Sequence, residues 1–128
     1  MFTLDQIKDI HNRFGKRSTL VQYLRTLKTI GVDKYDSFLA DGHSEYYGSN
    51  NQKIISASLH EKFTIAKISD KESLLKHLRL HGQGKTSYFE MAKGLADSGI
   101  EKWTFDTTKL TLTYFDKDGD EILVEEIK

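Results

Sequence analysis

The stretch Gly99-Ile100-Glu101-Lys102-Trp103 has the pattern of a helix that ends at a glycine and leads into a strand. The stretch Gly31-Val32-Asp33-Lys34-Tyr35 repeats this pattern 68 positions earlier. A glycine in this place supplies the left-handed conformation with which many helices end. The sequence therefore predicts the same passage from helix to strand twice.

The match between the two halves continues on both sides of these stretches at the same offset. The pairs that keep their apolar or aromatic character are Ile7/Leu75, Ile10/Leu78, Leu27/Leu95, Tyr46/Tyr114, Tyr47/Phe115, Ile54/Ile122 and Ile55/Leu123. We interpret the chain as a single domain, residues 1–128, with an internal pseudo-repeat of residues 1–60 and 69–128. Chance similarity is the alternative, because any α+β chain reuses the same caps and turns.

Apolar spacing and capping residues predict four helices, over residues 4–13, 18–30, 69–81 and 87–98. Thr3 with Gln6, and Ser69 with Glu72, fit the capping-box pattern at the starts of the first and third. The third helix is broken at the run 81–84, which contains two glycines.

Alternating residues between turn signals predict strands over residues 32–39, 44–47, 53–59, 101–106, 109–115 and 121–127, with a connecting strand over residues 63–68. The predicted fold is α+β: two tandem helix–helix–three-strand units, with helices packed on a mostly antiparallel sheet. Trp103 is expected to be largely buried in this sheet. A duplication would place the halves about a pseudo-twofold axis, and the groove between them would be the default place for a ligand.

Composition excludes several classes of function. The chain has no cysteine, which excludes disulfides, thiolate catalysis and cysteine-ligated zinc, and fits a cytoplasmic location. Its formal net charge is zero, which argues against a general nucleic-acid-binding surface. No apolar run approaches the ~20 residues of a membrane span, so we expect no membrane association through a spanning segment.

The candidate binding residues are Asp41, His43, Glu45 and Tyr47 from the polar second strand, together with His81. The four strand residues alternate, so a regular strand projects them from one face. A histidine between two carboxylates can act as a general base or as a ligand, whereas a solvated sheet face has the same pattern. No residue is assigned a catalytic role.

The two halves differ at this strand. The second half carries Leu110 and Leu112, where the first half has Gly42 and Ser44. The polar strand of the first half therefore contributes fewer apolar side chains to the core. We expect any site to lie there, facing the groove between the halves.

No metal or cofactor site is complete in the sequence. His77 and His81 share a helix face but lack a third ligand. Asp116, Asp118 and Asp120 alternate as in a calcium loop, but the loop lacks its glycine and its final glutamate at the required spacing. The run 84–86, Gly-Lys-Thr, lacks the earlier glycine of a phosphate-binding loop. We expect no bound metal and no cofactor.

Three strings carry a family resemblance: His81-Gly82-Gln83-Gly84-Lys85-Thr86-Ser87-Tyr88-Phe89, Ala96-Asp97-Ser98-Gly99-Ile100-Glu101-Lys102-Trp103 and Leu112-Thr113-Tyr114-Phe115-Asp116. Together they resemble the YbcV-like family, a bacterial domain-of-unknown-function family often labelled "phage envelope protein". The length and the order of elements fit along nearly the whole chain. The family more often has a cysteine on its fourth helix, and this chain departs from that pattern. The resemblance implies no established activity.

Two hypotheses of function follow. The first is a non-enzymatic binding module that takes a small molecule or a protein in the groove between the halves, and it predicts a pocket lined by both of them. The second is a small hydrolase-like or other enzyme that uses His43 with neighbouring carboxylates, and it predicts that these side chains converge in one cleft. A homodimer is compatible with either hypothesis.

Overall fold

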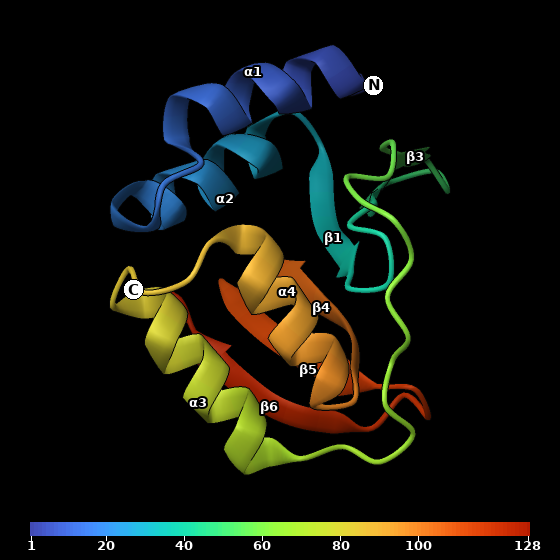
Figure 1. The fold of residues 1–128 in the computed structure, drawn as a ribbon. Coiled ribbons are helices and arrows are strands. Elements are labelled where there is room, and N and C mark those ends of the chain that lie inside the picture. Colours follow the sequence, from blue (N-terminus) through green and yellow to red (C-terminus); the bar gives the residue numbers. More distant parts are fainter.

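The structure is a computed structural model that describes the backbone of residues 1–128 and every side chain except that of Arg17. It has four α-helices and one six-stranded antiparallel sheet, which confirms the predicted α+β fold (Figure 1). Among the described residues, no helix is long and apolar enough to cross a membrane.

The helices come in two pairs, one before each set of three strands. They are α1 (Leu4–Phe14), α2 (Leu20–Thr29), α3 (Lys71–Gly82) and α4 (Tyr88–Asp97), with a short 3-10 turn at Arg17–Thr19 before α2. A capping box starts α1 at Thr3 and α4 at Ser87. The predicted box at Ser69 is wrong, because Asp70 caps α3 by accepting the N–H of Ser73 at 3.0 Å. Aspartate is among the preferred N-cap residues, so the helix begins one position later than the sequence predicts.

The sheet has the strand order β3-β2-β1-β4-β5-β6, so each half contributes three neighbouring strands. The strands are β1 (Val32–Phe38), β2 (Ser44–Gly48), β3 (Lys53–Ile55), β4 (Ile100–Asp106), β5 (Thr111–Asp116) and β6 (Glu121–Glu126). The halves join where β1 pairs with β4, and the register places Asp36 opposite Thr104, two positions 68 residues apart. A twofold axis between these residues would generate this register. The internal duplication itself stays a prediction.

Both helix pairs lie on the same face of the sheet, α1 and α2 over the first half and α3 and α4 over the second (Figure 1). Each pair has its own apolar core, around Leu24 and Leu27 in the first half and around Leu74 and Leu95 in the second. Trp103 and Leu112 pack against both cores, between the two helix pairs. The opposite face of the sheet carries no helix, and we call it the open face.

Two expectations are corrected by the tertiary contacts. Residues 63–68 form no strand, since their backbone bonds go to single carbonyls, from Phe63 to Ala40 and from Ala66 to Ala96. The third strand ends at Ile55 instead of residue 59, because the chain turns there toward the β1–β2 loop. Trp103, which the sequence predicts to be largely buried, keeps part of its surface exposed, because it lies between the two helix pairs and packs against both cores.

Candidate functional site

A groove of about 860 Å³ lies on the helix-covered face of the sheet, between the two helix pairs. One wall comes from the first half, with His11, Leu20 and Tyr23, and the other comes from the second, with Leu78, His81, Tyr88 and Met91. The groove is therefore lined by both halves of the chain. Its volume falls within the range of ~300–1,000 Å³ that is usual for small-molecule sites.

The sheet forms the floor of the groove and contributes mostly aromatic side chains. The floor residues are Tyr35, Ser37, Ser44, Tyr46, Trp103, Phe105, Leu112 and Tyr114. They alternate along their strands with residues of the open face, as the two-residue period of a strand requires. Four of the five aromatic residues, Tyr35, Tyr46, Phe105 and Tyr114, are only 4–8% exposed, and Trp103 is the floor ring that is left partly uncovered.

The difference between the halves appears at the floor. Gly42 and Ser44 line the groove on the first side, and Leu112 lines it on the second. Gly42 has φ +79° and Leu110, 68 positions later, has φ +55°, so both hairpins turn through the left-handed region. Gly42 is packed closely against Leu59 and His60, whereas Ser44 is partly exposed and occupies less of the space above β2 than leucine occupies above β5.

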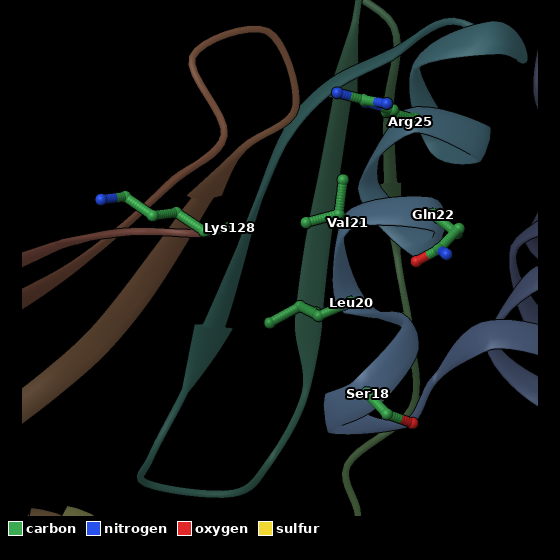
Figure 2. A pocket seen from close by; sticks show the side chains of 6 residues that line it. All are labelled: Ser18, Leu20, Val21, Gln22, Arg25 and Lys128. Carbon is green, nitrogen blue, oxygen red and sulfur yellow. The ribbon is translucent and has the colours of Figure 1, made fainter.

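A second, smaller cavity of about 340 Å³ adjoins the mouth of the groove, beside α2 (Figure 2). Leu20 and Lys128 line both cavities. The remaining lining residues of the smaller cavity are Ser18, Val21, Gln22 and Arg25. Figure 2 shows Leu20 and Val21 projecting from α2 into the space that separates the helix from Lys128.

The four candidate residues of β2 and its turn converge in one hydrogen-bonded network on the open face. His43 donates from Nδ1 to Asp41 at 2.5 Å and contacts Glu45 through Nε2 at 2.9 Å. The Tyr47 hydroxyl donates to Glu45 at 2.8 Å, and Lys53 lies 3.1 Å from the same carboxylate. His43, Asp41 and Glu45 keep only 16–20% of their side-chain surface exposed.

This network fixes the charges of its members. Burial alone would raise the pKa of Asp41 and Glu45, but hydrogen bonds outweigh it and lower both pKa values to about 2. Burial alone would lower the pKa of His43, but the two carboxylates outweigh it and raise that pKa above 6.5. Because both ring nitrogens of His43 contact carboxylates, neither is free to take a proton from a substrate.

The network continues across the sheet to a buried carboxylate. Tyr47 also lies close enough to Asp36, which is 4% exposed, to interact with its carboxylate electrostatically. Asp36 in turn accepts a hydrogen bond from Thr104 at 2.5 Å and lies 3.3 Å from the ammonium group of Lys102. The open face thus carries one polar network that joins β2, β1 and β4, and its members compensate one another's charges.

The two groups of candidate metal ligands differ in whether their side chains lie together. His81 donates from Nδ1 to the Thr86 carbonyl at 3.0 Å, while the ring of His77 packs on Gly94 of α4, so the two histidines are engaged separately. Asp116, Asp118 and Asp120 do bring one carboxylate oxygen each within 4.8 Å of one another. One Asp116 oxygen accepts the backbone N–H groups of Asp118 and Asp120, which is the ordinary geometry of an aspartate-stabilised turn.

The sequence profile of a family of proteins of unknown function, DUF1398, matches residues 8–126, which include most of α1, the other three helices and the whole sheet. The chain belongs to DUF1398. No curated protein matches it.

In this DUF1398 protein, the candidate residues lie in two places. Asp41, His43, Glu45 and Tyr47 share the open face, and His81 stands apart from them in the groove wall. Alternation predicted the shared face correctly, but the groove is lined by the other residues of the same strand. Sequence reasoning missed Ser37, Tyr35 and Tyr23, which the same alternation and helix period would place on the groove side of β1 and α2.

The His43 network makes the stability of this DUF1398 protein depend on pH. The raised His43 pKa contributes stability that is complete below pH 6.5 and is lost as the pH rises through the folded-state pKa. The lowered Asp41 and Glu45 pKa values contribute stability that is present above about pH 4.5 and is lost as the pH falls toward 2. We expect the difference in unfolding free energy between the protein and its His43→Asn variant to be largest near pH 5–6.5, measured by urea unfolding from pH 3 to 9.

The comparison with His43→Asn removes the contributions of the other histidines, which both proteins share. A difference that stays constant from pH 5 to 9 would show that His43 is not held as an imidazolium between the two carboxylates.

Proposed function

We propose that this DUF1398 protein is a binding module that holds a small, largely apolar molecule in the groove between its two helix pairs. The observation that carries the proposal is a groove of ligand size lined by residues of both halves. A small-molecule site is typically concave and apolar, with a few polar groups that orient the ligand, and this groove has the same make-up.

The half-buried Trp103 supports the proposal. Large aromatic side chains contribute most to stability when they are fully covered, yet Trp103 lies on the groove floor with part of its surface uncovered. A planar ligand would cover that surface. The edge-to-face contact of Trp103 with Tyr114, at 6.3 Å between ring centroids, holds the indole in place without a ligand.

The groove favours binding over catalysis. The histidine with two carboxylate neighbours lies on the open face, and its nitrogens are both engaged. The narrower YbcV-like resemblance, its phage label and a cytoplasmic location stay expectations from the sequence and carry no argument for the groove.

The test is a titration with 2-acetylnaphthalene, followed by ¹H–¹⁵N correlation spectra. Trp103 is the single tryptophan, so one indole cross-peak reports on the groove floor. We expect saturable shifts of this cross-peak and of backbone amides in both walls. Ser44→Leu, which places on β2 the residue type that fills the floor at Leu112, should weaken binding about tenfold through lost contact area.

Thr113→Leu is the matched control, since it adds a leucine on the open side of β5, paired with Thr104. It should bind as the unaltered protein does. Absence of saturable shifts, or unchanged binding by Ser44→Leu, would contradict the proposal. If the groove instead takes a second copy of the chain, the Trp103 cross-peak will shift with protein concentration alone.

A further inference from the structure

We infer that the ligand of the groove is an uncharged aromatic molecule that presents an oxygen acceptor, such as a ketone carbonyl, to Ser44. This inference rests on the proposed function and names the chemistry of the molecule bound there. It is carried by the hydroxyl groups, the charges and the rings of the floor.

Five hydroxyl groups line the groove, and we call them the hydroxyl chain: Tyr35, Tyr23, Tyr46, Ser44 and Ser37. Tyr23 interacts with both Tyr35 and Tyr46. The Ser44 and Ser37 hydroxyl groups are hydrogen-bonded, with their oxygens 3.1 Å apart. Each hydroxyl has one hydrogen to donate, so this bond uses the hydrogen of one serine and leaves that of the other. Hydroxyl hydrogens rotate, so the chain can present that hydrogen where an acceptor arrives.

Ser44 is the place where a ligand can reach the chain. The other four members are less than 9% exposed, whereas Ser44 is half-buried. Its position is small because the first half has serine where the second has Leu112. A ligand oxygen above β2 would therefore lie in the space that leucine fills in the other half.

The charges of the groove exclude an ionised ligand group at the floor. Every floor residue is uncharged, and the ionisable lining residues lie elsewhere: His11 and His81 in the walls, and the exposed Glu125, Glu126 and Lys128 at the rim near the C-terminus. An ionised group on the floor would be desolvated without a counter-charge, which is strongly unfavourable. An uncharged group needs only the hydrogen bond that the hydroxyl chain can supply.

The rings of the floor favour a planar body. Tyr35 lies between Tyr46 and Phe105, stacked on each with ring centroids 5.0 and 5.1 Å apart and planes inclined by 28°. These three residues are only 6–8% exposed, so they form the buried base of the floor, and the floor ring that a ligand can contact is the partly exposed indole of Trp103. Aromatic ligands pack on such a ring in offset or edge-to-face arrangements that add to the effect of burial.

The experiment compares three naphthalenes of similar shape by the Trp103 cross-peak: 2-acetylnaphthalene, 2-ethylnaphthalene and 2-naphthoate. The ketone should bind about fivefold more tightly than the hydrocarbon, as one added neutral hydrogen bond allows. The carboxylate should bind more weakly than either. Ser44→Ala should reduce the ketone affinity to that of the hydrocarbon and leave the hydrocarbon affinity unchanged, while Thr113→Ala should change neither.

The outcomes separate this inference from the proposed function. Equal affinities for ketone and hydrocarbon, a carboxylate that binds as tightly as the ketone, or a full ketone preference in Ser44→Ala would overturn the inference while the groove remains a binding site. If none of the three naphthalenes shifts the Trp103 cross-peak, the proposed function fails and this inference fails with it.

Discussion

Gly99→Ala should lower the free energy of unfolding by about 2–5 kcal/mol, because the new methyl group meets two separate obstacles. Gly99 has φ +84°, where a residue with a β-carbon is strained by ~1–2 kcal/mol. A β-carbon at this position would also lie 2.7 Å from the Ile68 carbonyl oxygen and 2.7 Å from the Ser69 α-carbon. These are backbone atoms of the chain that leads into α3, and they cannot move aside as a flexible side chain can.

Gly119→Ala is the matched control for the conformational part of this effect. Gly119 has φ +85°, nearly the same as Gly99, but nothing lies within 4 Å of its would-be β-carbon. Its cost should therefore be the strain alone, ~1–2 kcal/mol. Urea unfolding of both variants measures the difference. Equal costs would show that the segment before α3 does not press on the turn between α4 and β4.

The passage from helix to strand at Gly99 was predictable because caps and turns are local. The glycines at 31 and 99 both have positive φ, as expected of residues that close α2 and α4. Residues 63–68 show the limit of such reasoning. Their alternation is that of a strand, yet they pair with no strand of the sheet, and the N–H groups of Phe63 and Ala66 bond to isolated carbonyls of other elements.

The candidate site shows a second limit. Alternation placed Asp41, His43, Glu45 and Tyr47 on one face of β2 but could not say which face the helices cover. Which face is covered depends on the side of the sheet on which both helix pairs pack. Tertiary packing decides this, and the alternation within one strand does not. The apolar neighbours of these residues on β1, above all Tyr35 with 6% exposure, turn the opposite face toward the helices. The groove side of β2 thus carries Ser44 and Tyr46.

The half-burial of Trp103 has the same origin. The two-residue period of β4 correctly predicts that the Trp103 side chain faces the helices. How far this side chain is buried, however, depends on the distance between α2 and α4. The sequence of a single half contains no information on that separation. Only the pairing of β1 with β4, across the centre of the sheet, sets the distance between the two cores.

Lys102→Met should lower the free energy of unfolding by about 2–3 kcal/mol, because it leaves the buried Asp36 carboxylate without its cation. Asp36 has 6% of its side-chain surface exposed, and the Lys102 ammonium group lies 3.3 Å away. Methionine keeps much of the apolar stem of lysine, so the variant removes mainly the charge. Asp36 would keep its hydrogen bond from Thr104, which is why the cost stays below that of a fully unpaired buried ion.

A second substitution distinguishes lost charge from lost packing. Replacing both partners, Asp36→Thr with Lys102→Met, removes the buried charge together with its cation and should recover at least half of the lost stability.

Lys34→Met is the control on the same face. Lys34 lies over the Tyr47 ring, with its ammonium group 5.2 Å from the ring centroid, and is exposed, so its loss should cost under about 1 kcal/mol. Urea unfolding at pH 6 measures all three. If the double variant is as unstable as Lys102→Met alone, the lysine acts through packing of its stem on Phe38 and Phe115, over whose rings its ammonium group lies, and not through the charge of Asp36.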